Sequence, residues 1–180
     1  MLSCDEEEEV FSPKPRGYFR IEFPKKEYQR YDGNCPFSFE IPKYSSLRPS
    51  TSKNAHPCWF NLDFPKYKAT VYIDYNNIDN NLSQLLEDSR NFAVRHQVKS
   101  TGINETPVLR DSAKVFGLLY DIDGNTASSV QFYLTDSTHH FLRGSLYFNA
   151  SPNIDSLKMM VDFIREDILH LIKTTKWKDH

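Results

Sequence analysis

The sequence is poor in three features that would indicate particular classes of protein: long apolar runs, glycine and an excess of basic charge. No stretch approaches the roughly 20 apolar residues that a helix needs to cross a bilayer. Only 6 of the 180 residues are Gly, and no Gly-rich phosphate loop occurs. The formal net charge is −2, so nothing in the composition favours nucleic acid as a partner. Hydrophobic residues make up 39% of the chain, which is enough to build one core.

The specific signatures of zinc and hydrolase sites are missing as well. The chain has no His-Glu-x-x-His, no Gly-x-Ser-x-Gly and no Cys-x-x-Cys. The motifs therefore give no ground for an enzyme. We expect a binding or scaffolding protein that holds no cofactor and no metal.

Aromatic residues, by contrast, are abundant. The 13 Phe and 10 Tyr lie largely in segments that alternate apolar with polar residues. This period of two is typical of a strand with one buried face, and aromatic side chains favour strands. The predicted strands lie near residues 19–23, 37–41, 60–64, 69–73, 115–122, 127–134 and 141–148. Residues 45–57, rich in Ser, Pro, Asn and Lys, are predicted to form an exposed loop.

The period changes to that of a helix in residues 80–98 and again from residue 151 towards the C-terminus. The second segment carries a long apolar stripe that includes Ile164, Ile168 and Leu171. Strands paired by hairpins before and after a helix favour an antiparallel sheet of six or seven strands with both helices packed on it, so we predict the α+β class. The order of the elements also resembles that of the Mog1/PsbP-like α/β/α sandwich, an analogy of fold that carries no function.

The N-terminus has the features of a lipid-attachment site. The chain begins Met-Leu-Ser-Cys, and Leu-Ser-Cys is the end of a lipobox, where a bacterial signal peptide is cut before the cysteine that carries lipid, here Cys4. The alternative is an ordinary exposed cysteine near a start codon. An acidic run at residues 5–9 and a proline-rich stretch at residues 12–15 follow, and neither can bury apolar surface.

This pattern divides the chain into two parts. Residues 1–15 are predicted to form the lipid-attachment site and a flexible acidic and proline-rich tether, and residues 16–180 a single α+β domain. The charged and apolar signal peptide that should precede the cysteine is expected to have been removed.

The other two cysteines, Cys35 and Cys58, each lie beside a proline in loop-like sequence. In an oxidising compartment they are candidates for a disulfide that closes a loop of roughly 20 residues and stabilises the fold by about 3 kcal/mol. The alternative is two free buried thiols. A bridge favours export of the protein, whereas free thiols give no indication of the compartment in which it is located.

The densest polar cluster lies in the turn before the last predicted strand. The candidate binding surface consists of Asn125, Asp136, His139, His140 and Arg143. The two histidines and Asp136 are metal-ligating types, and Arg143 suits an anionic substrate. Adjacent residues of a strand point to opposite faces, however, so one metal cannot easily use both histidines. The alternative is a polar hairpin whose Asp and Ser side chains bond their own backbone.

Several longer motifs are similar to those of a known family. They are Pro-Lys-Pro-Arg-Gly-Tyr-Phe-Arg-Ile from Pro13, Cys-Pro-Phe-Ser-Phe from Cys35, Cys-Trp-Phe-Asn from Cys58, Gly-Asn-Thr-Ala-Ser-Ser from Gly124 and His-Phe-Leu-Arg-Gly from His140. Across residues 4–177 the sequence resembles the gliding motility-associated lipoprotein GldD family.

The resemblance implies a lipid-anchored cell-envelope protein of the Bacteroidota, needed for gliding motility and type IX secretion and without an established enzymatic activity. It also implies other gliding lipoproteins as partners, above all GldJ, and a lipid on Cys4 as the link to the membrane. The expected function is a non-enzymatic scaffold or stabilising subunit at the outer membrane, facing the periplasm. The acidic run after Cys4 also resembles signals that send some lipoproteins of this phylum to the cell surface.

A second hypothesis comes from the polar cluster alone. In it, the protein is a small-ligand binder or an enzyme that uses Asp136, His139, His140 and Arg143. It requires the four side chains to converge in one pocket, whereas the scaffold hypothesis does not.

Overall fold

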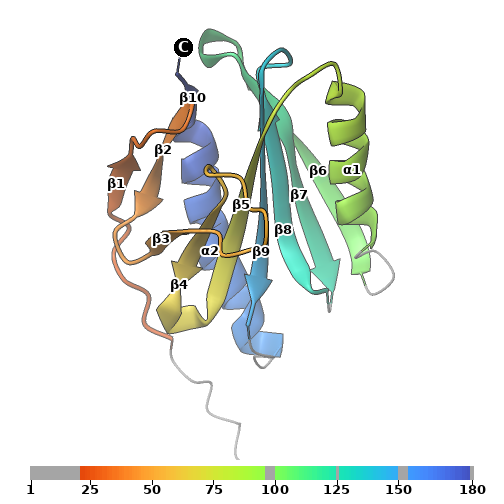
Figure 1. The fold of residues 1–180 in the computed structure, drawn as a ribbon. Coiled ribbons are helices and arrows are strands. Elements are labelled where there is room, and N and C mark those ends of the chain that lie inside the picture. Colours follow the sequence, from red (N-terminus) through yellow and green to blue (C-terminus); the bar gives the residue numbers. More distant parts are fainter. Residues whose placement is uncertain (1–20, 96–99, 125, 150–153, 179–180) are drawn as a thin grey trace, which may run out of the picture.

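The computed structural model describes residues 21–95, 100–124, 126–149 and 154–178, with side chains from residue 157 onward in the last range. These residues form two antiparallel sheets and two long helices (Figure 1). The predicted tether of residues 1–15, with Cys4, and the candidate residue Asn125 lie outside the described residues.

The larger sheet has seven antiparallel strands in the order β3-β4-β5-β9-β8-β7-β6. They are β3 (Ser46–Pro49), β4 (Phe60–Phe64), β5 (Ala69–Asn77), β6 (Ser100–Arg110), β7 (Val115–Gly124), β8 (Ser128–Thr135) and β9 (His140–Phe148). The central pairing joins the two halves of the chain, because all nine residues of β5 pair with β9. The predicted α+β class with an antiparallel sheet is confirmed.

The helices α1 (Leu82–Arg95) and α2 (Ile154–Thr174) lie on opposite faces of this sheet (Figure 1). The alternation of side chains along the strands shows why. On β8, Val130 and Phe132 belong to the core beneath α2, whereas Tyr133 packs in the smaller cluster around Ala93 of α1. The sheet is thus the middle layer of the molecule.

A smaller sheet shares the face that α2 covers. It is formed by β1 (Tyr28–Tyr31), β2 (Phe37–Pro42) and β10 (Lys176–Trp177), in the order β1-β2-β10. The ring of Phe37 lies 5.4 Å from that of Tyr75 on β5, and the Glu40 N–H donates to the Thr174 hydroxyl at the end of α2, 2.9 Å away. Both sheets therefore contact α2.

The apolar stripe predicted for the second helix is its buried face. Ile164, Ile168 and Leu171 are each at most 1% exposed and join the main core. The first helix is different, since only Ser89 and Ala93 are buried along its 14 residues. In the described ranges, no helix is long and apolar enough to cross a membrane.

Three local predictions differ from the structure. The first strand begins at Tyr28, and Ile21 and Phe23, predicted to be in a strand, lie in irregular chain; their side chains still pack on the core. The predicted loop at residues 45–57 contains the short strand β3. The edge strand β6 was not predicted, because none of its residues is buried and it contains Pro107, so its sequence lacks the apolar alternation of a half-buried strand.

Candidate functional site

The pleat of β9 separates the polar residues that the sequence grouped together. Arg143 lies on the α1 face, where its Nη2 is 2.6 Å from Asp74 Oδ2 and its guanidinium carbon 4.3 Å from the centre of the Phe92 ring. His140, three residues earlier, lies on the opposite face. The four side chains do not converge, so the hypothesis of a single site built from them is wrong.

Asp136 is occupied by its own hairpin. Its Oδ1 accepts hydrogen bonds from the backbone N–H groups of Thr138, His139 and His140 at 2.8–3.0 Å, and its Oδ2 accepts one from the Thr138 hydroxyl. Burial raises the pKa of Asp136, but these four donors outweigh it and lower the pKa to about 2. The carboxylate thus holds the turn, as expected if the cluster is a polar hairpin that bonds its own backbone.

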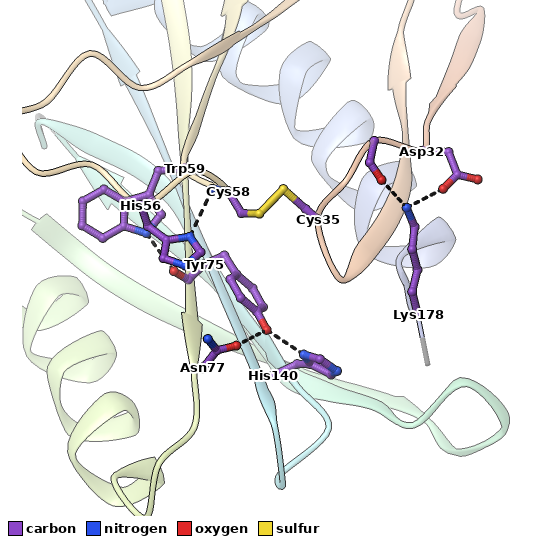
Figure 2. The surroundings of a disulfide bond; sticks show 10 residues. Asp32, Cys35, His56, Cys58, Trp59, Tyr75, Asn77, His140 and Lys178 are labelled. Carbon is purple, nitrogen blue, oxygen red and sulfur yellow. Dashed lines mark hydrogen bonds and ion pairs between the residues drawn. A yellow bond between two sulfur atoms is a disulfide. The ribbon is translucent and has the colours of Figure 1, made fainter. Parts of the chain in front are cut away.

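The two histidines lie in different surroundings. His140 is 7% exposed, and its Nδ1 is 2.7 Å from Tyr75 Oη (Figure 2). Its ring stacks on that of Trp177. Burial, and secondarily the charge of Asp136, raises the pKa of Tyr75 to about 12, so that its phenol keeps its proton. The side chain of His139 is 78% exposed. Among the described residues, no group of three or more His, Cys, Asp or Glu could hold a metal ion.

A disulfide between Cys35 and Cys58 lies near this buried histidine (Figure 2). Their Cα atoms are 5.7 Å apart, and the bridge joins the chain before β2 to the chain before β4. Of the two states considered for these cysteines, the structure contains the bridge and not the pair of thiols. The bond fastens the small sheet to the large one.

A pocket of about 940 Å³ opens where β10, the turn between β6 and β7, and the hairpin between β8 and β9 meet. We call it the basic pocket. Four of its lining side chains carry a permanent positive charge: Arg110, Lys114, Lys176 and Lys178. His139 and His140 also line it, and Asp136 is its one carboxylate among the residues that the structure describes. Three of the predicted site residues therefore border a pocket that Arg143 does not reach.

The cationic side chains of the basic pocket differ in whether a carboxylate pairs with them. Lys178 Nζ is 2.6 Å from Asp32 Oδ1 (Figure 2). Arg110 Nη1 donates instead to two carbonyl oxygens at the end of α2, those of Ile172 and Thr175, and burial lowers the pKa of Arg110. Within the described ranges, neither Arg110, Lys114 nor Lys176 is paired with a carboxylate.

A second polar group that the sequence did not reveal as important is Asp167, on the buried face of α2. It is 1% exposed and is held by Lys26 Nζ at 2.8 Å, Tyr28 Oη at 3.0 Å and Tyr44 Oη at 2.6 Å. Burial first and then the charge of Asp167 or its hydrogen bond raise the pKa values of both tyrosines. We call this group the Asp167 clamp. The available signal was a carboxylate within an apolar stripe, which requires partners.

The residues of the basic pocket gave a weaker signal. Lys176, Trp177 and Lys178 follow the last helix, while Arg110 and Lys114 lie more than 60 residues earlier. Their proximity comes from the antiparallel pairing of β10 with β2 and from the bond between Trp177 Nε1 and the Lys114 carbonyl, 2.9 Å long. Neither contact is visible in the order of residues.

The comparisons with known proteins decide the family. A family model described as gliding motility lipoprotein GldD matches residues 8–177. The chain belongs to the GldD family. The resemblance found in the sequence motifs is thereby confirmed. GldD-family membership makes the chain a member of a lipoprotein family of gliding motility; the candidate lipid-attachment residue Cys4 lies before the matched range.

Two further comparisons concern curated proteins and solved structures. The search of curated proteins gave no match. Among solved structures, this GldD-family chain is similar to the solution structure of cyanobacterial PsbP (CyanoP) from Synechocystis sp. PCC 6803, with a TM-score of 0.53 and 10% sequence identity. The match covers 88% of this chain and 97% of that one. At this identity the likeness shows the fold alone, and it confirms the predicted PsbP-like sandwich.

Proposed function

We propose that the protein is a non-enzymatic scaffold or stabilising subunit of the gliding motility and type IX secretion machinery of the Bacteroidota. In this role it is held in the outer membrane by a lipid on Cys4 and faces the periplasm. The observation that carries the proposal is the match to the GldD family over residues 8–177.

The way polar side chains are used supports a scaffold over an enzyme. Asp136 holds a turn, Arg143 pairs with Asp74, and Asp167 joins three segments of the chain. A catalytic acid, base or nucleophile has to reach a substrate with a proton or an electron pair available. These groups are instead bonded to other parts of the fold. Their arrangement favours a rigid body that presents a fixed surface.

The disulfide supports placement in the envelope. Bridges such as Cys35–Cys58 form and persist in oxidising compartments, of which the bacterial periplasm is one, and are rare in the cytosol. Together with a lipid on Cys4, such a placement puts the folded body next to the outer membrane. The alternative is that the folded domain faces the outside of the cell.

The anchor has a direct test. In the full-length precursor, Cys4→Ser should abolish lipid labelling and shift the protein from the membrane fraction to the soluble one. Cys35→Ser with Cys58→Ser in the same precursor is the matched control, because it removes both bridged cysteines and leaves the lipobox intact; it should keep the label. Retention of the Cys4→Ser protein in the membrane fraction would contradict the proposed anchor.

The partner is tested in the native bacterium. GldJ is the proposed partner, and a tagged copy of this protein should recover it from solubilised membranes, while a strain that lacks this protein should contain less GldJ. A control strain carrying an unrelated tagged lipoprotein measures background capture. If recovery does not exceed this background and the GldJ level is unchanged, the stabilising role fails.

A further inference from the structure

The basic pocket is positively charged on a protein whose formal net charge is −2. Asp136, the one carboxylate among its described lining residues, accepts hydrogen bonds from backbone N–H groups, and Lys178 forms an ion pair with Asp32. Lys114 and Lys176, both exposed, have no carboxylate partner among the described residues. A concave surface lined by one sign of charge attracts ligands of the other sign.

The lysines of the pocket stand on different elements of the fold. Lys114 follows the turn that leads into β7, while Lys176 lies on β10, which pairs with a different sheet. Trp177, the second residue of β10, donates through Nε1 to the Lys114 carbonyl, and its ring stacks on His140. The pocket therefore offers single charges from two different elements beside a flat aromatic surface.

This arrangement does not suit a compact phosphate dianion. Such groups are typically held at a helix N-terminus or by a bidentate Arg. Here the nearby helix terminus is the C-terminal end of α2, which carries a partial negative charge, and Arg110 already donates through Nη1 to the carbonyls of Ile172 and Thr175. Carboxylates on successive residues of a peptide suit two lysines that stand on different elements better, with the methylene groups of the same side chains able to lie on Trp177.

We infer that the basic pocket binds an acidic peptide segment of a partner protein, with Lys114 and Lys176 as its main contacts. The inference rests on the proposed scaffold role, because it names the chemistry of a partner. The N-terminal part of the described chain enters at the end of the body opposite to β10 (Figure 1). The pocket thus lies away from that entry point and open to a second protein.

The test is a titration of the full chain with a fluorescein-labelled hexaglutamate peptide, followed by fluorescence polarisation at low and physiological salt. Lys114→Glu with Lys176→Glu should weaken binding by about tenfold or more, since both attractive charges become repulsive. Lys25→Glu with Lys53→Glu is the matched control: it changes the net charge equally at exposed lysines outside the pocket and should change the affinity less than about twofold.

Three outcomes overturn the inference. Absence of hexaglutamate binding does so directly, and so does an equal loss in both double variants, which would mean attraction by net charge alone. Displacement of the peptide by inorganic phosphate or by vesicles of anionic lipid, at matched charge concentration, would assign the pocket to a phosphate group. Circular dichroism of each variant verifies that the chain is folded.

A fourth arm concerns the acidic run of this chain at residues 5–9. Changing these residues to Asn and Gln should leave the affinity for hexaglutamate unchanged if the pocket serves a partner. A gain of more than about threefold would show that the run competes for the pocket and would overturn the assignment to a partner. A failure of peptide binding would not change the expected recovery of GldJ or the expected lipid on Cys4. The proposed scaffold function and the proposed peptide site are therefore tested independently.

Discussion

On one face of the seven-stranded sheet, α2 buries Ile164, Ile168 and Leu171 together with the carboxylate of Asp167, whereas on the other face α1 buries only Ser89 and Ala93. The α2 face also carries the small sheet and the disulfide that fastens it. The α1 face leaves large side chains in contact with solvent: Tyr72 is 40% and Phe92 37% exposed.

This difference in burial indicates which face of the sheet contributes more to the stability of the fold. Apolar burial stabilises by roughly 25 cal/mol per Å², and a buried charge must be paired, so the α2 face is both the main source of stability and the more vulnerable one. The α1 face contributes less and tolerates change. Substitutions that probe the two faces should therefore differ severalfold in their effect on the free energy of unfolding.

The largest effect is expected at Asp167. Asp167→Ala leaves two partly buried tyrosine hydroxyls without their acceptor and removes the buried charge partner of Lys26, which keeps its bond to the Phe163 carbonyl; it should lower the free energy of unfolding by about 3–5 kcal/mol. Asp88→Ala on exposed α1, where the carboxylate accepts one bond from Gln84, should cost less than about 0.5 kcal/mol. Chemical denaturation measures both. Equal costs would remove the distinction between the faces.

The disulfide should have the next largest effect. The double change Cys35→Ala and Cys58→Ala opens a loop with a sequence separation of 23 and should lower the free energy of unfolding by about 3 kcal/mol. Reductant should destabilise the wild-type chain by a similar amount and leave the double variant unaffected. A reductant effect of equal size on the double variant would show that the bridge is not its target.

The hairpin that borders the basic pocket should respond to pH. The native pKa of Asp136, about 2, lies below its ordinary value of 3.8, so its charge stabilises the fold fully above about pH 4, and this contribution is lost as the pH falls towards 2. Asp136→Asn should therefore cost about 2 kcal/mol at pH 7 and progressively less between pH 4 and pH 2. Denaturation of both chains across this range measures the difference. A cost independent of pH would contradict the assigned role of the charge.

The smallest effect is expected on the α1 face. Phe92→Ala removes a half-exposed ring stacked over the Arg143 guanidinium and should lower the free energy of unfolding by about 1 kcal/mol or less. Phe132→Ala, which removes a ring 1% exposed beneath α2, is the matched comparison and should cost about 3–5 kcal/mol. Similar costs for the two rings would mean that α1 covers the sheet more tightly than its burial indicates.

The periodicity of apolar residues predicted the elements that have one buried face. The stripe of α2 and the alternation of β4 and β5 were visible because one face of each is buried. Periodicity did not predict β6, whose side chains are largely exposed on both faces, and it wrongly placed Ile21 and Phe23 in a strand, because tertiary packing of isolated apolar side chains produces the same pattern.

The candidate site was harder to predict, for a physical reason. The turn chemistry of Asp136 is local, and the sequence offered it as one of two alternatives. The split between His140 and Arg143 depends on where the turn ends and the pleat begins, which a single residue of register decides. The basic pocket needs Lys114 and Lys176 to meet through contacts between two different sheets, which have no local signature.

The Asp167 clamp also determines how the body would carry a load applied to its N-terminal chain. Lys26 and Tyr28, close to the first described residue, are bonded to the middle of α2, which both sheets hold in place. Tension that enters from the N-terminal side meets this crosslink to α2 before it can peel β1 from β2. The helix then takes up the pull along its packed length, so the clamp protects the pairing of β1 with β2 from a load on the N-terminal chain.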